Sequence, residues 1–295
     1  MKGLLITSAL LISFFSHSQN KLIADSLYQN QAWPEAITAY QKHLKKSPSD
    51  SAAWFNTGMS HLSLKNYPKA MKAFKEASKY NYPAGRVYLA LAKTSALTND
   101  LDAMYEALEK GAESGLAAYA FIKSEPAFSQ QLNADRFLKL LNKIKLNAYP
   151  CLSAPNYRHF DFWLGAWDVF ANGRKAGVNV ISMAEGGCAI HENYTTAGNY
   201  SGQSINYYDP IDEKWHQHWV GSGGDVYNYL ETKRDTGMLQ FESKYMGPGG
   251  QISLSRLTFT LNDDGTVRQL FESSTDEGRT WAPAFDGLYK KQNNQ

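Results

Sequence analysis

The sequence lacks an excess of charge of either sign, and it lacks any long apolar segment beyond its N-terminus. Its 30 basic and 28 acidic residues are interspersed and leave a formal net charge of +2, so nothing indicates a nucleic-acid-binding surface. After the first 20 residues, no stretch is apolar enough to span a membrane. The composition therefore predicts neither a nucleic-acid partner nor a membrane span once the N-terminal segment is removed.

Common catalytic motifs are also missing. The stretch "GSGGD" at residues 221–225 lacks the G-x-S-x-G form of a nucleophile elbow. The carboxylates of the C-terminal half are scattered over different expected strands, so no acid pair can be placed at a catalytic separation. No cofactor is expected, and the sequence leaves open whether the protein is an enzyme.

The first residues follow the order of parts that is typical of a secretory signal peptide. A lysine supplies the positive start, residues 4–15 form the apolar core, and the small residues Ser16 and Ser18 precede the expected cleavage point. The apolar core is short for a membrane span of about 20 residues, and no cysteine follows it for lipid attachment. We therefore expect residues 1–18 to be removed and the protein to be exported, with a retained membrane anchor as the alternative.

The two cysteines, Cys151 and Cys188, both lie in the C-terminal half. In an oxidising compartment, an isolated pair most simply forms one disulfide. The bond would close a loop of 36 intervening residues and would stabilise the fold by ~3 kcal/mol. A catalytic thiol that uses His191 as its base is the alternative.

The N-terminal half repeats itself at an offset of 34 residues. Residues 52–83 resemble a tetratricopeptide repeat, with a weaker copy before them and a more degenerate copy after them. Small residues let the two helices of a repeat approach closely, while aromatic residues fill the space between repeats. The resemblance implies repeats over residues 19–115 that bind a protein or peptide partner, or that act only as a spacer. The aligned pairs are Ala24 and Gly58, Ala36 and Ala70, and Tyr40 and Phe74.

After the repeats, the pattern changes from helices to strands. Residues 116–149 place Phe137, Leu141 and Ile144 at helical spacing, which predicts capping helices and a linker. Residues 150–295 then alternate between apolar and polar positions in roughly ten short segments separated by turn residues. The predicted fold class is α+β in two segregated domains, a helical repeat solenoid followed by an antiparallel up-and-down β-barrel.

The first strand of the barrel carries the G-x-W arrangement of lipocalin-type barrels, at Gly165 and Trp167. The stretches "RHFDFWLGAWDV", "GCAIHENY", "KWHQHWV", "SSTDEGRTW" and "FDGLYKK" together resemble an uncharacterised lipocalin-like domain of exported bacterial proteins. The resemblance implies a barrel whose floor is closed by Trp167, with Lys290 or Lys291 packed over the indole. It also implies a periplasmic or secreted bacterial protein, and it carries no established activity.

The stretch from Ser274 to Trp281 spells S-x-D-x-G-x-x-W, the Asp-box turn of sialidase propellers. In that motif, Ser and Asp side chains bond the backbone of a tight hairpin and the Trp packs beneath it. A propeller would show several copies over a longer chain. The single copy therefore predicts one well-made hairpin.

The stretch "KWHQHWV" contains His216 and His218 in an H-x-H pair, which can hold a metal ion. A catalytic zinc site needs a third protein ligand, and His191 and Glu192 on the preceding strand are candidates. The alternative function is therefore a barrel enzyme that uses these four residues, either around a metal or as acid and base. Haem held through one of the histidines is a related alternative.

The register of this hairpin decides which side chains face the barrel interior. If Tyr208 pairs with Trp215, the histidines share the outer face and the alternate residues face inward. We expect that inner face to bind a small, largely apolar molecule, whereas a completely filled core would leave the barrel as an interaction module. The expected ligand-binding residues are Asn206, Tyr208, Trp215, Gln217, Trp219 and Glu192.

Overall fold

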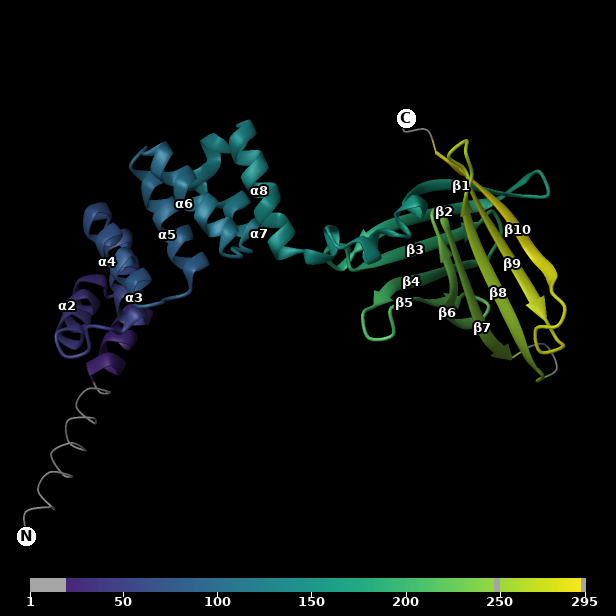
Figure 1. The fold of residues 1–295 in the computed structure, drawn as a ribbon, viewed down its shortest axis with the longest axis horizontal. Coiled ribbons are helices and arrows are strands. Elements are labelled where there is room, and N and C mark those ends of the chain that lie inside the picture. The colour runs from purple at the N-terminus through teal and green to yellow at the C-terminus, as the bar shows by residue number, and fades with distance from the viewer. Residues whose placement is uncertain (1–19, 247–249, 293–295) are drawn as a thin grey trace, which may run out of the picture. The chain divides into compact units, whose positions relative to one another are not determined.

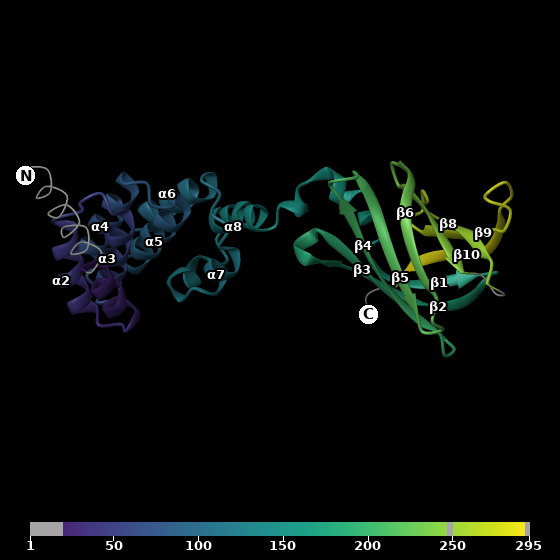
Figure 2. The same cartoon turned by 90° about the horizontal axis from the view of Figure 1, so that it is seen from below.

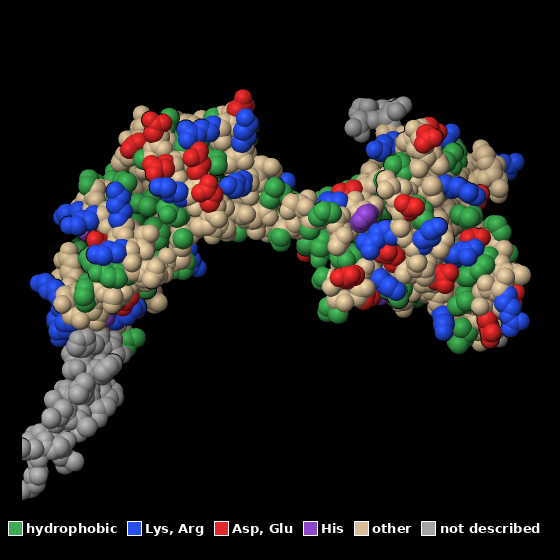
Figure 3. Space-filling view, in the orientation of Figure 1, with side chains coloured by type: hydrophobic (Ala, Val, Ile, Leu, Met, Phe, Trp, Pro, Cys, Tyr) green, Lys and Arg blue, Asp and Glu red, His purple; other side chains and the backbone are tan. Residues whose placement is uncertain are grey.

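Residues 20–246 and 250–292 are described by the computed structural model, and the expected signal peptide lies outside them. The chain divides between Ala148 and Tyr149 into a helical unit and a β unit (Figures 1 and 2). This division confirms the predicted fold class of helical repeats followed by an antiparallel barrel. On the face seen in Figure 3, basic and acidic side chains are interspersed over both units.

The helical unit consists of antiparallel helix pairs. Its first described segment, residues 20–29, is helical, and among the described helices none has the length and apolarity to cross a membrane. The helices α3 and α4 pack against each other, as do α5 and α6. The helices that follow are α2 (Trp33–Leu44), α3 (Ser51–Ser63), α4 (Tyr67–Lys79), α5 (Ala84–Leu97), α6 (Leu101–Glu113), α7 (Tyr119–Ser124) and α8 (Asp135–Ala148), with a 3-10 turn at Pro126–Gln131.

The 34-residue repeat is visible in the backbone at the turn inside each helix pair. Gln31, Lys65 and Asn99 adopt left-handed φ values of 59°, 58° and 57° at that spacing. The N–H of the residue after each one bonds to the carbonyl five positions back, at 2.8 to 2.9 Å, which is the Schellman ending of a helix. The third copy, which is degenerate in sequence, therefore keeps the turn geometry of the other two.

Small residues permit the close helix packing that the repeat pattern predicts. A Cβ added at Gly58 on α3 would lie 2.5 Å from Cε1 of Phe74 on α4, so the ring occupies the space of the missing side chain. Ala36 and Ala70 are fully buried at equivalent positions. At the end of the unit, α8 buries Phe137, Leu141 and Ile144 and contacts α6, as expected of a capping helix.

The β unit is a closed barrel in which every strand pairs antiparallel with the next and β1 pairs with β10. This is the up-and-down order that the sequence predicts. Asn172 and Gly173, both with positive φ, form the turn between the first two strands. The strands are β1 (Gly165–Ala171), β2 (Arg174–Ala184), β3 (Ala189–Thr196), β4 (Ser201–Asp209), β5 (Lys214–Gly221), β6 (Val226–Asp235), β7 (Met238–Met246), β8 (Ile252–Leu261), β9 (Val267–Ser274) and β10 (Ala282–Lys291).

One end of the barrel is filled by the segment that precedes β1. Phe160 and Trp163 are fully buried, and their rings stack with centroids 4.8 Å apart. Trp167 donates its indole N–H to the Trp163 carbonyl at 2.8 Å, and Lys291 lies 5.4 Å from the centre of the Trp167 ring. Of the two candidate lysines, Lys291 therefore lies over Trp167, whereas Lys290 lies over Phe170.

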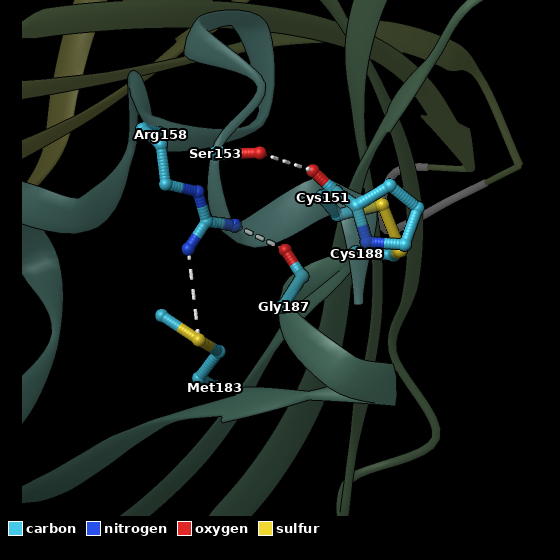
Figure 4. Close-up of a disulfide and its surroundings, with 7 residues drawn as sticks. Cys151, Ser153, Arg158, Met183, Gly187 and Cys188 are labelled. Carbon is cyan, nitrogen blue, oxygen red and sulfur yellow. Dashed lines mark hydrogen bonds between the residues drawn. A yellow bond between two sulfur atoms is a disulfide. The ribbon is translucent and has the colours of Figure 1, made fainter. Parts of the chain in front are cut away.

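The predicted disulfide joins Cys151 to Cys188, with the two Cα atoms 5.0 Å apart. It ties the 3-10 turn Pro150–Leu152, which precedes the plug, to the 3-10 turn Glu185–Gly187 between β2 and β3 (Figure 4). Beside it, Arg158 donates to the Gly187 carbonyl and contacts the Met183 sulfur (Figure 4). The cross-link therefore fastens the plug segment to the barrel wall.

The hairpin between β9 and β10 has the contacts expected of an Asp-box turn. The Ser274 hydroxyl accepts the Gly278 N–H at 2.9 Å, and Asp276 accepts the Thr280 N–H at 2.9 Å. Trp281 donates its indole N–H to the Gly278 carbonyl at 3.1 Å. The Thr280 hydroxyl also donates to Asp276, at 2.6 Å. The hydrogen bonds that Asp276 accepts lower its pKa to about 2, and the Thr280 hydroxyl makes the largest contribution. The motif thus forms one well-bonded hairpin, as predicted.

Candidate ligand cavity of the barrel

A cavity of about 450 Å³ occupies the half of the barrel away from the Trp163 and Trp167 plug. Its mouth lies at the hairpins that join β3 to β4 and β5 to β6, because residues from both hairpins line it. The wall is mostly aromatic, with a few polar groups. The lining residues are Ala176, Glu192, Tyr194, Thr196, Tyr200, Gln217, Trp219, Asp225, Tyr227, Tyr229, Leu257, Gln269, Phe271, Phe285 and Tyr289.

Trp219 at the mouth is held by two neighbouring glycines and one carboxylate. A Cβ added at Gly202, diagonally across the β4–β5 pair and two residues from the partner of Trp219, would lie 2.1 Å from the indole Cζ2. The indole N–H donates to Asp225 at 2.9 Å, and the Tyr200 hydroxyl donates to the same oxygen at 2.7 Å. Gly221 makes room for Asp225 in turn, since a Cβ there would lie 2.2 Å from the carboxylate. Packing and hydrogen bonds thus fix the side chains of Trp219, Tyr200 and Asp225 at the rim.

At the inner end of the cavity lies Glu192, on β3. Its carboxylate accepts a hydrogen bond from the Ser204 hydroxyl at 2.6 Å and another from the Asn179 amide at 2.7 Å. Burial raises the pKa of Glu192 to about 7, and these two hydrogen bonds only partly oppose the increase. The protein thus contains a buried carboxyl group that changes its charge near neutral pH.

The polar groups around Glu192 form one network across several strands. The Asn179 amide also reaches the Tyr289 hydroxyl at 3.3 Å, and that hydroxyl donates to Gln269. On the other side, the Asn206 amide donates to the Ser204 hydroxyl at 2.9 Å. The Oδ1 atoms of Asn179 and Asn206 are buried and have no donor among the described residues. The network is therefore rich in acceptors.

The predicted hairpin register is confirmed, since Ser204 pairs with Trp219, Asn206 with Gln217, and Tyr208 with Trp215. Three of the six predicted ligand-binding residues line the cavity, namely Glu192, Gln217 and Trp219. Asn206 lies behind the wall, within the network of Glu192.

The remaining two predicted residues, Tyr208 and Trp215, face inward but lie at the closed end. The Trp215 indole donates to the Asn156 carbonyl and the Asn156 amide donates to the Tyr208 hydroxyl, both at 3.1 Å. They hold the plug segment and are absent from the cavity lining.

The three histidines of the alternative site do not meet Glu192. His191 contacts Gln203 at 3.2 Å, and His218 lies between Asn228 at 2.6 Å and Tyr207 at 3.2 Å. These contacts are on the outer surface, because residues alternate between faces along β3 and β5, and Glu192 beside His191 and Gln217 beside His218 are buried. The cluster of three histidines with Glu192 is thus divided between the two sides of the barrel wall.

One group of described residues with metal-compatible spacing includes His216. Its ligand atoms and those of Asp209 and Asp212 lie within 4.8 Å of one another at the β4–β5 turn. His216 already contacts Asp212 at 2.9 Å, and Asp209 accepts the Ile211 N–H at 2.8 Å. The group is on the outer surface, away from the cavity, and its hydrogen bonds are those of an ordinary turn.

Sequence reasoning missed most of the aromatic wall. Tyr227 and Tyr229 alternate along β6, and their rings stack with centroids 5.6 Å apart. The ring centroid of Phe271 on β9 lies 6.0 Å from that of Tyr227, although the two residues are 44 positions apart in the sequence. Each of these residues lies on a strand that the alternation predicts. Only the closure of the barrel brings them to one cavity.

Part of the helical unit matches a known protein family. The tetratricopeptide repeat family matches residues 21–86. The TPR2B domain of yeast Sti1, in its complex with pHsp70, is 18% identical with a TM-score of 0.33, covering 44% of this chain and 96% of that one. The type III secretion translocator chaperone SycD of Yersinia enterocolitica is 19% identical with a TM-score of 0.33, covering 44% and 92%.

No curated protein matches the chain. The family match spans the first two helix pairs, and the turn geometry continues into the third pair beyond it. Repeats of this family suggest protein–protein interaction. The N-terminal unit is thus a helical repeat unit that matches the tetratricopeptide repeat family over residues 21–86, and a closed ten-stranded barrel follows it.

Proposed function

We propose that the protein is an exported binding protein whose repeats dock a protein partner and whose barrel binds a small, largely apolar ligand. The observation that carries the barrel part is the cavity of about 450 Å³, which has aromatic walls and a polar inner end. Ligand pockets commonly fall in the range of roughly 300–1,000 Å³ and combine apolar walls with a few polar groups. The lipocalin-like character expected from Gly165 and Trp167 belongs to the same proposal.

The distribution of side-chain volume supports a hollow interior in the half of the barrel near the cavity mouth. The closed end holds large rings, including Phe160, Trp163 and Trp215. Near the mouth, Gly202 and Gly221 leave room only for the rim side chains that lie against them. A barrel that served only as a solid interaction module would need additional bulk in this half.

The test is equilibrium dialysis of the full chain against apolar probes, with variants that change the cavity volume. Ala176 lines the cavity, so Ala176→Trp should fill it and abolish binding. Val180 on the same strand is exposed, so Val180→Trp is the matched control and should bind as the wild type does. Equal binding by both variants, or no binding by the wild type, would contradict the cavity proposal.

A second candidate, acid–base catalysis, is favoured by one observation. Glu192 is a buried carboxyl group at a cavity, and its pKa of about 7 suits proton transfer at neutral pH. Of the four residues in the sequence-based enzyme hypothesis, Glu192 alone lines the cavity. A Glu192→Gln variant that still binds a cavity ligand but no longer converts it would favour catalysis. Recovery of unchanged ligand from the wild type would contradict it.

The proposal of export rests on the N-terminal sequence and is supported by the disulfide, which is typical of oxidising compartments. Cell fractionation followed by mass spectrometry tests it directly. We expect periplasmic or secreted protein that lacks residues 1–18 and has no free thiol. Full-length, reduced protein confined to the cytoplasm would contradict export.

The proposed partner of the repeats is a protein or peptide, as repeats of this family suggest. Cross-linking in intact cells, followed by identification of the linked peptides, would define the docking surface. We expect links to a partner protein from lysines of the helical unit. Links that form only from barrel lysines would contradict this assignment.

A further inference from the structure

The cavity has a one-sided charge. Among the described residues that line it, none is Lys, Arg or His, whereas Glu192 and Asp225 are acidic. Glu192 lies at the inner end, and Asp225 is at the rim beside Trp219 and Tyr200. An anionic ligand would meet two carboxyl groups and no cation, so charge complementarity disfavours fatty acids and other carboxylates.

Three basic side chains of the neighbouring strands make their contacts away from Glu192. Arg256 on β8 donates to Glu272 at 2.9 Å and lies over the Trp281 ring. Arg268 on β9 makes two hydrogen bonds to Asp286, at 2.7 and 2.8 Å. Lys291 on β10 covers Trp167 at the barrel floor. These contacts leave Glu192 hydrogen-bonded to neutral side chains.

The inner end of the cavity presents a carboxylate. Glu192 accepts one hydrogen bond from Ser204 and one from Asn179, both neutral donors, and its side chain lines the cavity. A carboxylate in an apolar cavity is best complemented by a group that carries hydrogen-bond donors and a positive charge. An ammonium group has up to three N–H donors and no acceptor.

Aromatic rings surround the path between the rim and Glu192. Tyr227 and Tyr229 present a stacked pair, and Phe271 approaches the edge of that pair. Burial, together with the nearby charge of Glu192, raises the pKa values of Tyr194 and Tyr289. Both phenols are therefore neutral at physiological pH. Neutral aromatic rings attract cations through their faces and accommodate an apolar body equally well.

We propose that the cavity binds an amphiphilic amine, meaning an apolar body that carries a protonated primary or secondary amine, with the ammonium against Glu192. The inference rests on the proposed function of the cavity as a ligand site, and it names the class of ligand. The apolar body lies between the aromatic walls, while the ammonium contacts the Glu192 carboxylate at the inner end. The charge of Glu192 is then compensated by the ligand.

Three probes with one shared body test this assignment in the full chain. We choose 4-phenylbutylamine, 4-phenylbutanol and 4-phenylbutanoate and measure their dissociation constants by calorimetry at pH 8, where Glu192 is ionised. The amine should bind about ten-fold or more tightly than the alcohol, and the carboxylate should bind most weakly. Binding of the alcohol or the carboxylate as tightly as the amine would overturn the inference and leave the cavity function standing. Binding of none of the three would contradict the proposed function itself.

A pair of variants separates the buried carboxylate from general surface charge. Glu192→Gln should remove the advantage of the amine over the alcohol and leave the affinity for the alcohol nearly unchanged. Glu242 on β7 has buried neighbours on both sides, which places it on the outer face, so Glu242→Gln should keep the wild-type preference. Retention of the full preference in folded Glu192→Gln protein would overturn the inference. The ranking of the three probes on the wild type tests it independently of how the variants fold.

Discussion

Trp219 lies against Gly202 so closely that a Cβ at position 202 would come within 2.1 Å of the indole. We therefore expect Gly202→Ala to displace the indole and to break its hydrogen bond to Asp225. Overpacking of this kind typically costs about 1–3 kcal/mol of unfolding free energy. Ligand affinity should fall as well, because Trp219 forms part of the cavity mouth. Tryptophan emission, chemical denaturation and ligand titration measure the three effects.

Gly198, in the loop between β3 and β4, supplies the control. A Cβ there would meet only the Thr196 hydroxyl, at 3.7 Å, so Gly198→Ala should leave stability and binding close to those of the wild type. Equal effects of the two substitutions would contradict a specific role for the contact between Gly202 and Trp219.

The raised pKa of Glu192 makes barrel stability dependent on pH. In the unfolded chain this carboxyl group ionises near pH 4.5, but in the folded barrel it retains its proton up to about pH 7. The folded state therefore binds more protons between these values, and stability should fall as pH rises from 4.5 to 7. The loss should be on the order of 3 kcal/mol and should level off above pH 7. Urea denaturation at a series of pH values, without ligand, measures it.

Glu192→Gln is the matched variant for this pH effect. It cannot ionise, so its stability should be flatter between pH 4.5 and 7 and should exceed that of the wild type at pH 8. A decline of the same size in both proteins would show that other groups cause the pH dependence.

The sequence allowed the faces of the strands to be predicted, but not their depth in the barrel. The four residues between Asp209 and Lys214 form the β4–β5 turn, and counting back from that turn gave the correct pairing of Tyr208 with Trp215. Strand alternation says which side chains point inward and nothing about how far along the barrel a ligand can penetrate. That depth is set by Trp163, in the short 3-10 turn Asp161–Trp163, and by Phe160 just before it, in a segment without periodic patterning.

Glu192 illustrates the same limit. The sequence placed it among the expected ligand-binding residues, whereas its raised pKa comes from burial, which the hydrogen bonds from Ser204 and Asn179 only partly oppose. Ser204 and Asn179 lie on different strands, so no local sequence motif predicts that they contact Glu192. The resemblance to tetratricopeptide repeats was more informative, because its spacing is local and the positive φ at Gln31, Lys65 and Asn99 follows it directly.

The disulfide should stabilise the barrel by fastening the plug segment. Removing it through Cys151→Ser with Cys188→Ser should lower the unfolding free energy by ~3 kcal/mol, as expected for a loop of this length. Loosening of the plug should also expose Trp163 and Trp167 to solvent. Thermal denaturation and fluorescence quenching by iodide measure these effects, and unchanged stability with unchanged quenching would contradict the role given to the cross-link.

In the helical unit, substitution by alanine should change stability differently at Gly58 on α3 and at Gly85 on α5. Gly58→Ala places a Cβ 2.5 Å from the Phe74 ring and should destabilise the repeats by about 1–3 kcal/mol. At Gly85 the nearest atom would be 3.4 Å away, so Gly85→Ala should be neutral or stabilising by up to about 1 kcal/mol through helix propensity. Helical circular dichroism during denaturation distinguishes the two. Equal destabilisation by both would contradict the packing described for Gly58.

A crystal structure of the full chain soaked with 4-phenylbutylamine is the most direct test of amine binding in the barrel, because it locates ligand and cavity in one measurement. We expect density for the phenyl ring between Trp219 and Phe271, with the amine nitrogen within hydrogen-bonding distance of Glu192. A cavity filled by the side chains of the barrel itself, or ligand density found only on the outer surface, would contradict amine binding in the barrel.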